Sequence, residues 1–361
     1  MSKGYFFSFK KRRGDRTLRW AFLVLAIVAV AVFAFAKVSD VRMEKEMRDT
    51  VSQAVAAFEK KANAVKVECE PADALNSASY ILLQRTGFSR KFEGRENWVD
   101  ETDGEGADDA YLHNRIWSAE KPDSRIYPAS MVKIITALVV LDGAPDLDRE
   151  ITLTDADFSH YYGDGASIAG FRSGETFSIR DLLYGVLISS GSECTAALAV
   201  EVAGGEEAFV ERMNAMAKRI GMKDSHFTNP VGLHEKKNYS TVSDIALALD
   251  YALYNEDFYE FFTTQTYRTA STASRPEGYE LKSTLYQKEG LELEMADGRI
   301  LGGKTGYTSD AGQCLASYFV KDDVGFLLVT AEAMPDNFRT QALHIDDLLT
   351  VYGAIKIDKG E

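Results

Sequence analysis

The sequence predicts an α/β fold with a helical region inserted between its strands. Three observations support this fold class: a short apolar run at residues 80–83, helical patterns between residues 146 and 290, and two strand-like segments followed by a helix after residue 303. An order of strand, helices, paired strands and helix is typical of an α/β chain with an inserted helical region.

The first expected elements have clear boundaries. The globular part is predicted to begin near residue 78, with a buried strand at residues 80–83 that Gly87 ends. Residues 88–109 are polar and acidic, which indicates a surface insertion. An apolar helix is expected over residues 130–141, since a proline precedes it and a glycine follows it.

The rest of the chain supplies more helices and two strands. Helical patterns fall at residues 179–188, 194–202, 206–220 and 242–254, within a predicted helical subdomain at about residues 146–290. Strands are expected at residues 313–320 and 325–331, and a last amphipathic helix at residues 337–352. The globular domain is therefore predicted to span residues 78–355.

Composition excludes several classes of protein. The chain has 361 residues and is 45% hydrophobic and 27% charged, a mixture typical of a globular protein. Its net charge of −14 argues against a nucleic-acid partner. The 3 cysteines have no metal-binding spacing and cannot all pair, so neither zinc nor a disulfide-stapled fold is expected.

The N-terminus has the pattern of a membrane-directed segment. Residues 1–20 carry seven basic side chains and one acid, and residues 20–36 have no charge. This predicts a cytoplasmic basic segment at residues 1–19 and a transmembrane signal-anchor at residues 20–36, with the rest of the chain outside the cytoplasm. Cleavage after Ala36, in an Ala-x-Ala pattern, is the alternative.

A helical stalk or linker is expected at residues 37–77, between this anchor and the domain. Apolar residues between positions 43 and 65 recur at spacings of four and three, with charged residues between them, which predicts an amphipathic helix. The alternative is a helix that packs on the domain itself.

The tetrapeptide Ser130-Met131-Val132-Lys133 opens the apolar helix and supplies a candidate nucleophile. Residues i and i+3 lie on one helical face, so the hydroxyl and the amine can meet. A lysine removes the proton of a serine only if burial or a nearby cation keeps the amine neutral. The pattern alone is weak, since residues 8–11 and 118–121 match it too, and helix capping by Ser130 is the alternative.

Two further motifs carry candidate chemistry. Lys304-Thr305-Gly306 begins the C-terminal strands, where a strand edge can bind an extended peptide, Gly306 permits its close approach, and the lysine and threonine can bind a carboxylate. Ser189 to Glu193 lie between two apolar helices, and their hydroxyls can relay protons. A turn is the alternative for each motif.

The three motifs in this order resemble those of the penicillin-binding serine acyltransferases. The flanking segments are similar to those of the D-alanyl-D-alanine carboxypeptidases, the low-molecular-mass penicillin-binding proteins; they are residues 127–138, 226–241 and 302–316. The resemblance covers residues 78–355. It implies a β-lactamase/transpeptidase-like antiparallel sheet flanked by helices, with an all-helical subdomain.

The resemblance also implies a role for each motif residue. Ser130 would attack the terminal D-Ala-D-Ala bond of a peptidoglycan stem peptide, with Lys133 as the base, held neutral partly by the positive Lys304. Ser190 would pass protons at the leaving-group side. The backbone N–H groups of Ser130 and Tyr307 would form the oxyanion hole. β-lactam antibiotics would inhibit the enzyme covalently.

The substrate-binding residues follow from the same resemblance. Lys304, Thr305 and Gly306 would hold the terminal part of the substrate, and Arg339, on the expected last helix, would assist at its carboxylate, although a surface arginine is the alternative. No metal or organic cofactor is implied. The expected location is the cytoplasmic membrane, with a single pass and an extracytoplasmic catalytic domain.

Three departures from the family pattern stand out. Ser192 occupies the position where the family usually has an asparagine, and a serine offers less hydrogen bonding to a substrate amide. The insertion at residues 88–109 has no counterpart in the family. Only 55 residues follow Gly306, so the C-terminal β-rich domain of many relatives is expected to be missing.

The alternatives to a carboxypeptidase are a D,D-endopeptidase, a β-lactamase and a non-catalytic wall-binding or penicillin-sensing protein. An endopeptidase would use the same residues. A β-lactamase needs a base for rapid hydrolysis of its acyl-enzyme, and Glu235 to Asn238 only loosely resemble the segment that supplies one. Ser192 is the only support for the non-catalytic alternative.

Overall fold

The computed structural model describes residues 66–69, 75–85, 114–144, 146–159, 165–272, 274–287, 294–322, 324–337 and 340–358. The predicted anchor at residues 20–36, the expected helix at residues 43–65 and the acidic insertion at residues 88–109 lie outside these residues. Within the described ranges, no helix has both the length and the apolar character needed to cross a membrane.

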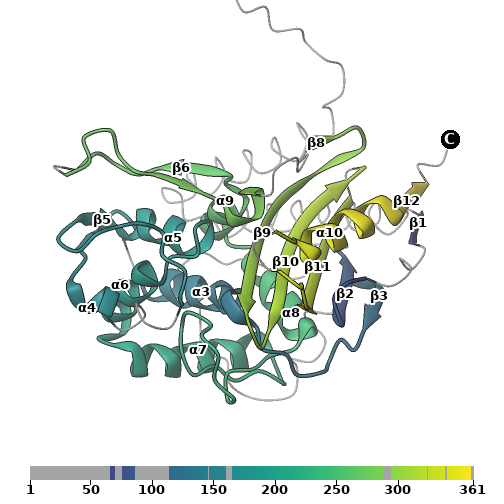
Figure 1. Ribbon diagram of the computed structural model, residues 1–361, viewed down its shortest axis with the longest axis horizontal. Coiled ribbons are helices and arrows are strands. Elements are labelled where there is room, and N and C mark those ends of the chain that lie inside the picture. Colours follow the sequence, from purple (N-terminus) through teal and green to yellow (C-terminus); the bar gives the residue numbers. More distant parts are fainter. Residues whose placement is uncertain are drawn as a thin grey trace, which may run out of the picture. The chain divides into compact units, whose positions relative to one another are not determined.

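A six-stranded antiparallel sheet forms the centre of the fold, in the order β3-β2-β11-β10-β9-β8 (Figure 1). The strands are β2 (Ser79–Gln84), β3 (Arg115–Glu120), β8 (Glu294–Met295), β9 (Gly298–Thr308), β10 (Gly312–Lys321) and β11 (Val324–Ala333). The three apolar strands expected from the sequence are confirmed as β2, β10 and β11. Strand β3 was not expected, because its mostly exposed residues lack an apolar run.

Helices cover both faces of this sheet. Alternate residues of β2 point to opposite faces, so Ile81 and Leu83 join one hydrophobic core while Leu82 joins another. The first core includes helices α3 (Lys133–Gly143) and α8 (Val242–Ala252), and the second includes α10 (Leu343–Ala354). The sheet is therefore a layer between α10 and the helical region, and β9 packs against the 3₁₀ turn Ala129–Val132 that precedes α3.

The helical region contains the four predicted helices, together with two short helices and two hairpins that the sequence patterns do not predict. Its helices are α4 (Asp155–Ser159), α5 (Ile179–Leu187), α6 (Ser192–Ala203), α7 (Glu206–Ile220), α8 and α9 (Glu256–Thr263). It also contains the hairpins β4–β5 (Glu150–Thr152 and Thr176–Ser178) and β6–β7 (Thr266–Arg268 and Glu280–Lys282). The expectation of an all-helical subdomain is wrong on this point, because three-residue strands with exposed polar positions leave no pattern to detect.

The folded part extends beyond the predicted limits of residues 78 and 355. Strand β1 (Lys66–Cys69) pairs antiparallel with β12 (Ile355–Asp358), so part of the expected linker belongs to the domain. Val67 and Ile355 are buried in the same core as α10. The Asp347 carboxylate also accepts hydrogen bonds from the backbone N–H and side chain of both Asn76 and Ser77, at 2.6–3.0 Å.

Candidate active site

Ser130 and Lys133 meet at the start of α3, as the sequence predicts. The chain enters through a 3₁₀ turn (Ala129–Val132), and the Lys133 Nζ lies 3.1 Å from the Ser130 Oγ. Neither this turn nor α3 has a side-chain cap hydrogen bond, so the alternative that Ser130 only caps the helix is wrong. Ser130 is partly exposed and Lys133 is fully buried, which suits a nucleophile with a desolvated base.

A loop from the stretch at residues 226–233 holds the amine of Lys133. The Nζ donates a hydrogen bond of 2.7 Å to the backbone carbonyl of Val231. The next residue, Gly232, has φ +86°, and a Cβ there would overlap the backbone carbonyl of Ala129. The Asn229 side-chain oxygen accepts from the N–H of Gly232 at 2.8 Å. Only glycine permits this close approach, so this loop and the turn that carries Ser130 pack backbone against backbone.

Ser190 and Lys304 form a second pair on the other side of the site. Ser190 follows α5 and is buried, and its Oγ accepts a hydrogen bond of 3.0 Å from the Lys304 Nζ. The same Nζ donates to the backbone carbonyl of Thr305 at 2.9 Å. Ser190 has φ +60°, a left-handed conformation that is uncommon for residues other than glycine. Such conformations cost free energy and cluster at functional sites.

Strand β9 closes the site beside the turn that carries Ser130. A Cβ built on Gly306 would lie 3.0 Å from the backbone N of Ser130 and 3.1 Å from the Ala129 Cβ, so a side chain there would force the turn or the strand to shift by a few tenths of an ångström. Thr305 is half-buried, and its Oγ1 lies 2.7 Å from the Thr284 Oγ1. Tyr307 is 42% exposed, which leaves its ring at the surface of the site.

Burial sets the protonation of the two lysines. Desolvation lowers the pKa of Lys133 from 10.5 to about 7, although the nearby Glu193 opposes the shift. Burial, together with the charge of Lys133, also lowers the pKa of Lys304 well below its ordinary value. Burial, one of the two causes that the sequence suggested, is thus the main reason for the low pKa of Lys133, and the two amines also disfavour each other's charge.

Ser192 begins α6 and lies deeper than expected. It is fully buried, and its Oγ has no hydrogen-bond partner among the described residues. The adjacent Glu193 is also fully buried; its Oε1 accepts from the backbone N–H of Gly170 at 2.9 Å, while its Oε2 has no partner in the same part of the chain. Burial raises the pKa of Glu193. Within the described ranges, the Ser192 Oγ and the Glu193 Oε2 are therefore two buried polar atoms without a hydrogen-bond partner, close in sequence to Ser190.

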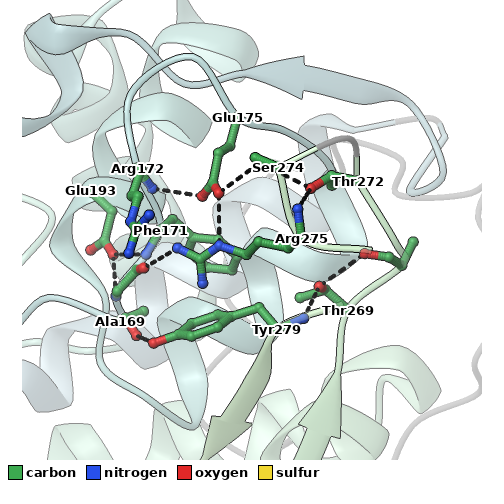
Figure 2. A network of polar contacts seen from close by, with 12 residues as sticks. Ala169, Phe171, Arg172, Glu175, Glu193, Thr269, Thr272, Ser274, Arg275 and Tyr279 are labelled. Atoms are coloured by element: carbon green, nitrogen blue, oxygen red, sulfur yellow. Dashed lines mark hydrogen bonds and ion pairs between the residues drawn. The ribbon is translucent and has the colours of Figure 1, made fainter. Parts of the chain in front are cut away.

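A polar network behind this motif holds the loop at residues 167–172 in place (Figure 2). The Arg275 side chain donates to the Glu175 Oε1 and to the backbone carbonyl of Gly170, both at 2.7 Å. Its guanidinium stacks over the ring of Tyr279, 4.0 Å from the centroid. Burial opposes ionisation of Glu175, but hydrogen bonds from Arg275 and Ser274 hold its pKa below the ordinary value. The connection between β6 and β7 therefore holds in place, by hydrogen bonds, the loop whose backbone contacts Glu193.

Arg339 lies outside the described residues. The last helix, α10, begins at Leu343, so the expected start near residue 337 is wrong. Among the described residues before this helix, the N–H of Gln341 donates to the backbone carbonyl of Asn337 at 3.0 Å.

Three residues at the site have contacts there that the sequence patterns do not predict: Val231, Thr284 and Glu193. Val231 acts through its carbonyl, which no side-chain pattern reveals, although the surrounding segment was singled out for its resemblance. Glu193 follows the Ser-x-Ser motif directly and could have been found there. No metal-binding cluster of His, Cys, Asp or Glu occurs in the described ranges.

The solved structures that match this one share its fold, that of the D,D-transpeptidases and D,D-carboxypeptidases. The crystal structure of the Streptomyces K15 DD-transpeptidase matches with a TM-score of 0.60 at 20% identity, over 79% of this chain and 98% of that one. The D-alanyl-D-alanine carboxypeptidase from Mycobacterium tuberculosis H37Rv matches with a TM-score of 0.61 at 20% identity, over 79% and 93% of the two chains.

Sequence comparison then defines the family. Residues 110–334 match the D-alanyl-D-alanine carboxypeptidase family, and the chain belongs to it. It is 31% identical to the D-alanyl-D-alanine carboxypeptidase DacF of Bacillus subtilis over 57% of this chain and 51% of the relative. It is also 31% identical to the D-alanyl-D-alanine endopeptidase of Pseudomonas aeruginosa, over 56% and 62% of the two. The aligned part thus spans about half to two-thirds of these relatives.

Proposed function

We propose that this protein is a serine D,D-carboxypeptidase that removes the terminal D-alanine from peptidoglycan stem peptides ending in D-Ala-D-Ala. The observation that carries the proposal is the pair formed by the Ser130 hydroxyl and the fully buried Lys133 amine, 3.1 Å apart. Burial lowers the pKa of this amine to about 7, so a large fraction is neutral and able to accept a proton near neutral pH.

Acylation starts when the neutral Lys133 takes the proton of the Ser130 hydroxyl. The Ser130 Oγ then forms a bond to the carbonyl carbon of the D-Ala-D-Ala peptide bond, and the carbonyl oxygen takes the negative charge. We assign the backbone N–H groups of Ser130 and Tyr307 as donors to this oxyanion; a donor of this kind contributes about 10²–10³ in rate. The close packing of Gly306 against the backbone of Ser130 supports this assignment.

Breakdown of this intermediate releases D-alanine. The C–N bond breaks as the leaving amine takes, through the Ser190 hydroxyl, the proton that Lys133 removed from Ser130, so Lys133 becomes neutral again. The Ser190 hydroxyl is held in place by a hydrogen bond from Lys304. Lys304 and Thr305 bind the carboxylate of the departing residue. A water molecule then attacks the ester carbonyl and gives its proton to Lys133. The bond between the acyl carbon and the Ser130 Oγ breaks, and Lys133 returns this proton to the Oγ, which restores the free enzyme. β-lactams would stop the cycle at the ester.

Release of D-alanine from a D-Ala-D-Ala peptide tests the proposal. We expect turnover by the wild type and none by Ser130→Ala or Lys133→Met. Because the base must be neutral, kcat/KM should rise with pH and level off above an apparent pKa near 7. A wild type that binds the peptide but releases no D-alanine contradicts the proposal and favours the non-catalytic alternative, which the position of Ser192 supports.

A D,D-endopeptidase is the second candidate, supported by the similarity to the Pseudomonas aeruginosa endopeptidase. The same residues would cut a cross-link in which a second peptide occupies the leaving-group side. Parallel assays with a stem pentapeptide and a cross-linked peptide dimer separate the two activities. We expect the larger kcat/KM for the pentapeptide, and the reverse order would make the endopeptidase the main activity.

A β-lactamase activity has less support than the carboxypeptidase activity. Glu235, the nearest analogue of a deacylating base in the sequence, is exposed, and its Oε1 accepts a hydrogen bond of 3.0 Å from the Asn229 side chain. A carboxylate engaged in its own loop is poorly placed to activate water at Ser130. We therefore expect the penicilloyl ester to persist.

The same proposal includes a location. We infer that residues 1–19 are cytoplasmic, that residues 20–36 anchor the chain in the cytoplasmic membrane and that the catalytic domain lies outside, where peptidoglycan is found. Protease treatment of intact cells should reach the domain. A mature N-terminus at Lys37 would show a cleaved signal in place of the anchor.

A further inference from the structure

We infer that Thr284 is a positioning residue that orients the Thr305 hydroxyl toward the carboxylate of the substrate. This inference rests on the proposed function and adds a residue to its carboxylate-binding side. Thr284 begins the 3₁₀ turn Thr284–Gln287, which follows hairpin β6–β7 and packs against β9.

Thr284 connects the two motifs that face each other across the site. Its Oγ1 lies 2.7 Å from the Oγ1 of Thr305 on β9. Its backbone N–H donates a hydrogen bond of 2.8 Å to the carbonyl of Ile188, two residues before Ser190. The neighbouring Ser189 hydroxyl donates to the carbonyl of Lys282 at 3.2 Å. The turn that carries Thr284 is thus fixed to both sides by backbone and side-chain bonds, which sets the position of its hydroxyl.

The number of protons and lone pairs on the Thr284 and Thr305 hydroxyls explains how one orients the other. Each hydroxyl has one proton to donate and two lone pairs to accept with. When Thr305 donates its only proton to a substrate carboxylate, the contact with Thr284 persists only if Thr284 is the donor. In that arrangement the Thr305 oxygen accepts from Thr284, and its own proton points away toward the carboxylate. A hydroxyl that both accepts and donates is also a stronger donor.

The arrangement should affect substrates only through their carboxylate, and this gives a direct test. The two probes are an N-acyl-D-alanyl thioester of thioglycolate, which carries a carboxylate at the leaving-group side, and the methyl ester of the same compound. Attack by Ser130 forms the acyl ester and breaks the C–S bond, and the released thiol, reprotonated at the site, is quantified by chromatography. The measured quantity is the ratio of kcat/KM for the acid to that for the methyl ester.

We expect Thr284→Val to lower this ratio about two- to tenfold, the effect of one neutral hydrogen bond. Thr284→Ser, which keeps the hydroxyl, should restore the ratio. The matched control is Thr152→Val, which removes one hydroxyl of a Thr152–Thr176 pair 2.8 Å apart in hairpin β4–β5; its ratio should equal that of the wild type. If Thr284→Val does not fold, Thr284→Ala removes the same hydroxyl without adding a methyl group.

The outcomes separate this inference from the proposed function. An unchanged ratio in the variants that lack the hydroxyl overturns the inference, even if both probes react more slowly, because an equal loss indicates only a structural role. A ratio that Thr284→Ser fails to restore overturns it too. A wild type that releases no thiol from either probe overturns the proposed function and the inference together.

Discussion

Replacing Lys133 by methionine is expected to abolish acylation of Ser130 and to stabilise the folded protein at neutral pH. Folding buries the amine completely and lowers its pKa from 10.5 to about 7. Because one pKa unit corresponds to 1.36 kcal/mol, this shift represents a cost of roughly 5 kcal/mol at or below neutral pH. Methionine has a similar length and carries no charge, so it removes that cost.

The substitution also removes a hydrogen bond. The Lys133 Nζ donates to the Val231 carbonyl at 2.7 Å, and an unpaired buried carbonyl costs about 1–3 kcal/mol. The expected net gain is therefore roughly 2–4 kcal/mol near neutral pH. In the wild type the folded-state pKa lies below the unfolded one, so between these two values the unfolded chain binds the extra proton. Wild-type stability thus rises with pH across this window, and the advantage of the variant disappears by its upper end.

Denaturant unfolding near pH 7 and near the ordinary pKa of lysine tests this prediction. We expect a large free-energy difference between Lys133→Met and wild type at the lower pH, and none or a reversed one at the higher pH. The control is Lys236→Met, at an exposed lysine, which should change stability little at either pH. A Lys133→Met protein that is less stable than wild type at both values, or a difference independent of pH, would refute the assignment of a neutral, desolvated amine.

Three further predictions concern residues around the site: Ser192, Gly306 and Arg275. Ser192→Asn should hold or raise kcat/KM for D-alanine release, while Ser192→Ala should lower it; equal turnover of Ser192→Ala and wild type would exclude a catalytic part for this hydroxyl. Gly306→Ala should lower kcat/KM about tenfold or more, since a Cβ there lies 3.0 Å from the backbone nitrogen of the nucleophile, and unchanged kinetics would contradict the packing of β9. Arg275→Gln should lower the free energy of unfolding by about 3 kcal/mol, because the side chains of Arg275 and Glu175 are only 12% and 4% exposed. Its control is Arg268→Gln, which breaks a pair whose side chains are 55% and 38% exposed and should cost less than about 1 kcal/mol; similar losses in the two variants would contradict the argument.

The parts of the site that could be predicted follow from local patterns in the sequence. Ser130 and Lys133 meet because they are one helical turn apart, a relation that any turn of this kind imposes. A strand edge at Lys304-Thr305-Gly306 could be predicted because two apolar strands follow this motif and its glycine permits the close approach of another chain. The order of the motifs added the resemblance that brought Ser190 and Lys304 together, although they are 114 positions apart.

Contacts that form only when distant parts of the chain pack together could not be predicted in the same way. The Val231 carbonyl and the Thr284 hydroxyl reach the site only through tertiary packing, and neither residue type has a signal of its own. Hairpin β6–β7, which holds Arg275, consists of three-residue strands that are too short for a period to show. The sequence names burial and a nearby cation as possible causes of a low pKa at Lys133, but only the folded structure shows that burial is the larger one.

Covalent labelling by benzylpenicillin tests the central claim most directly. The purified protein and its Ser130→Ala variant are incubated with the antibiotic and compared by intact-protein mass spectrometry, followed by mapping of the labelled peptide. We expect a wild-type adduct with the mass of the whole antibiotic, located on Ser130 and long-lived, and an unlabelled variant. An unlabelled wild type, or equal labelling of the variant, would contradict the assignment of Ser130 as the acylated nucleophile.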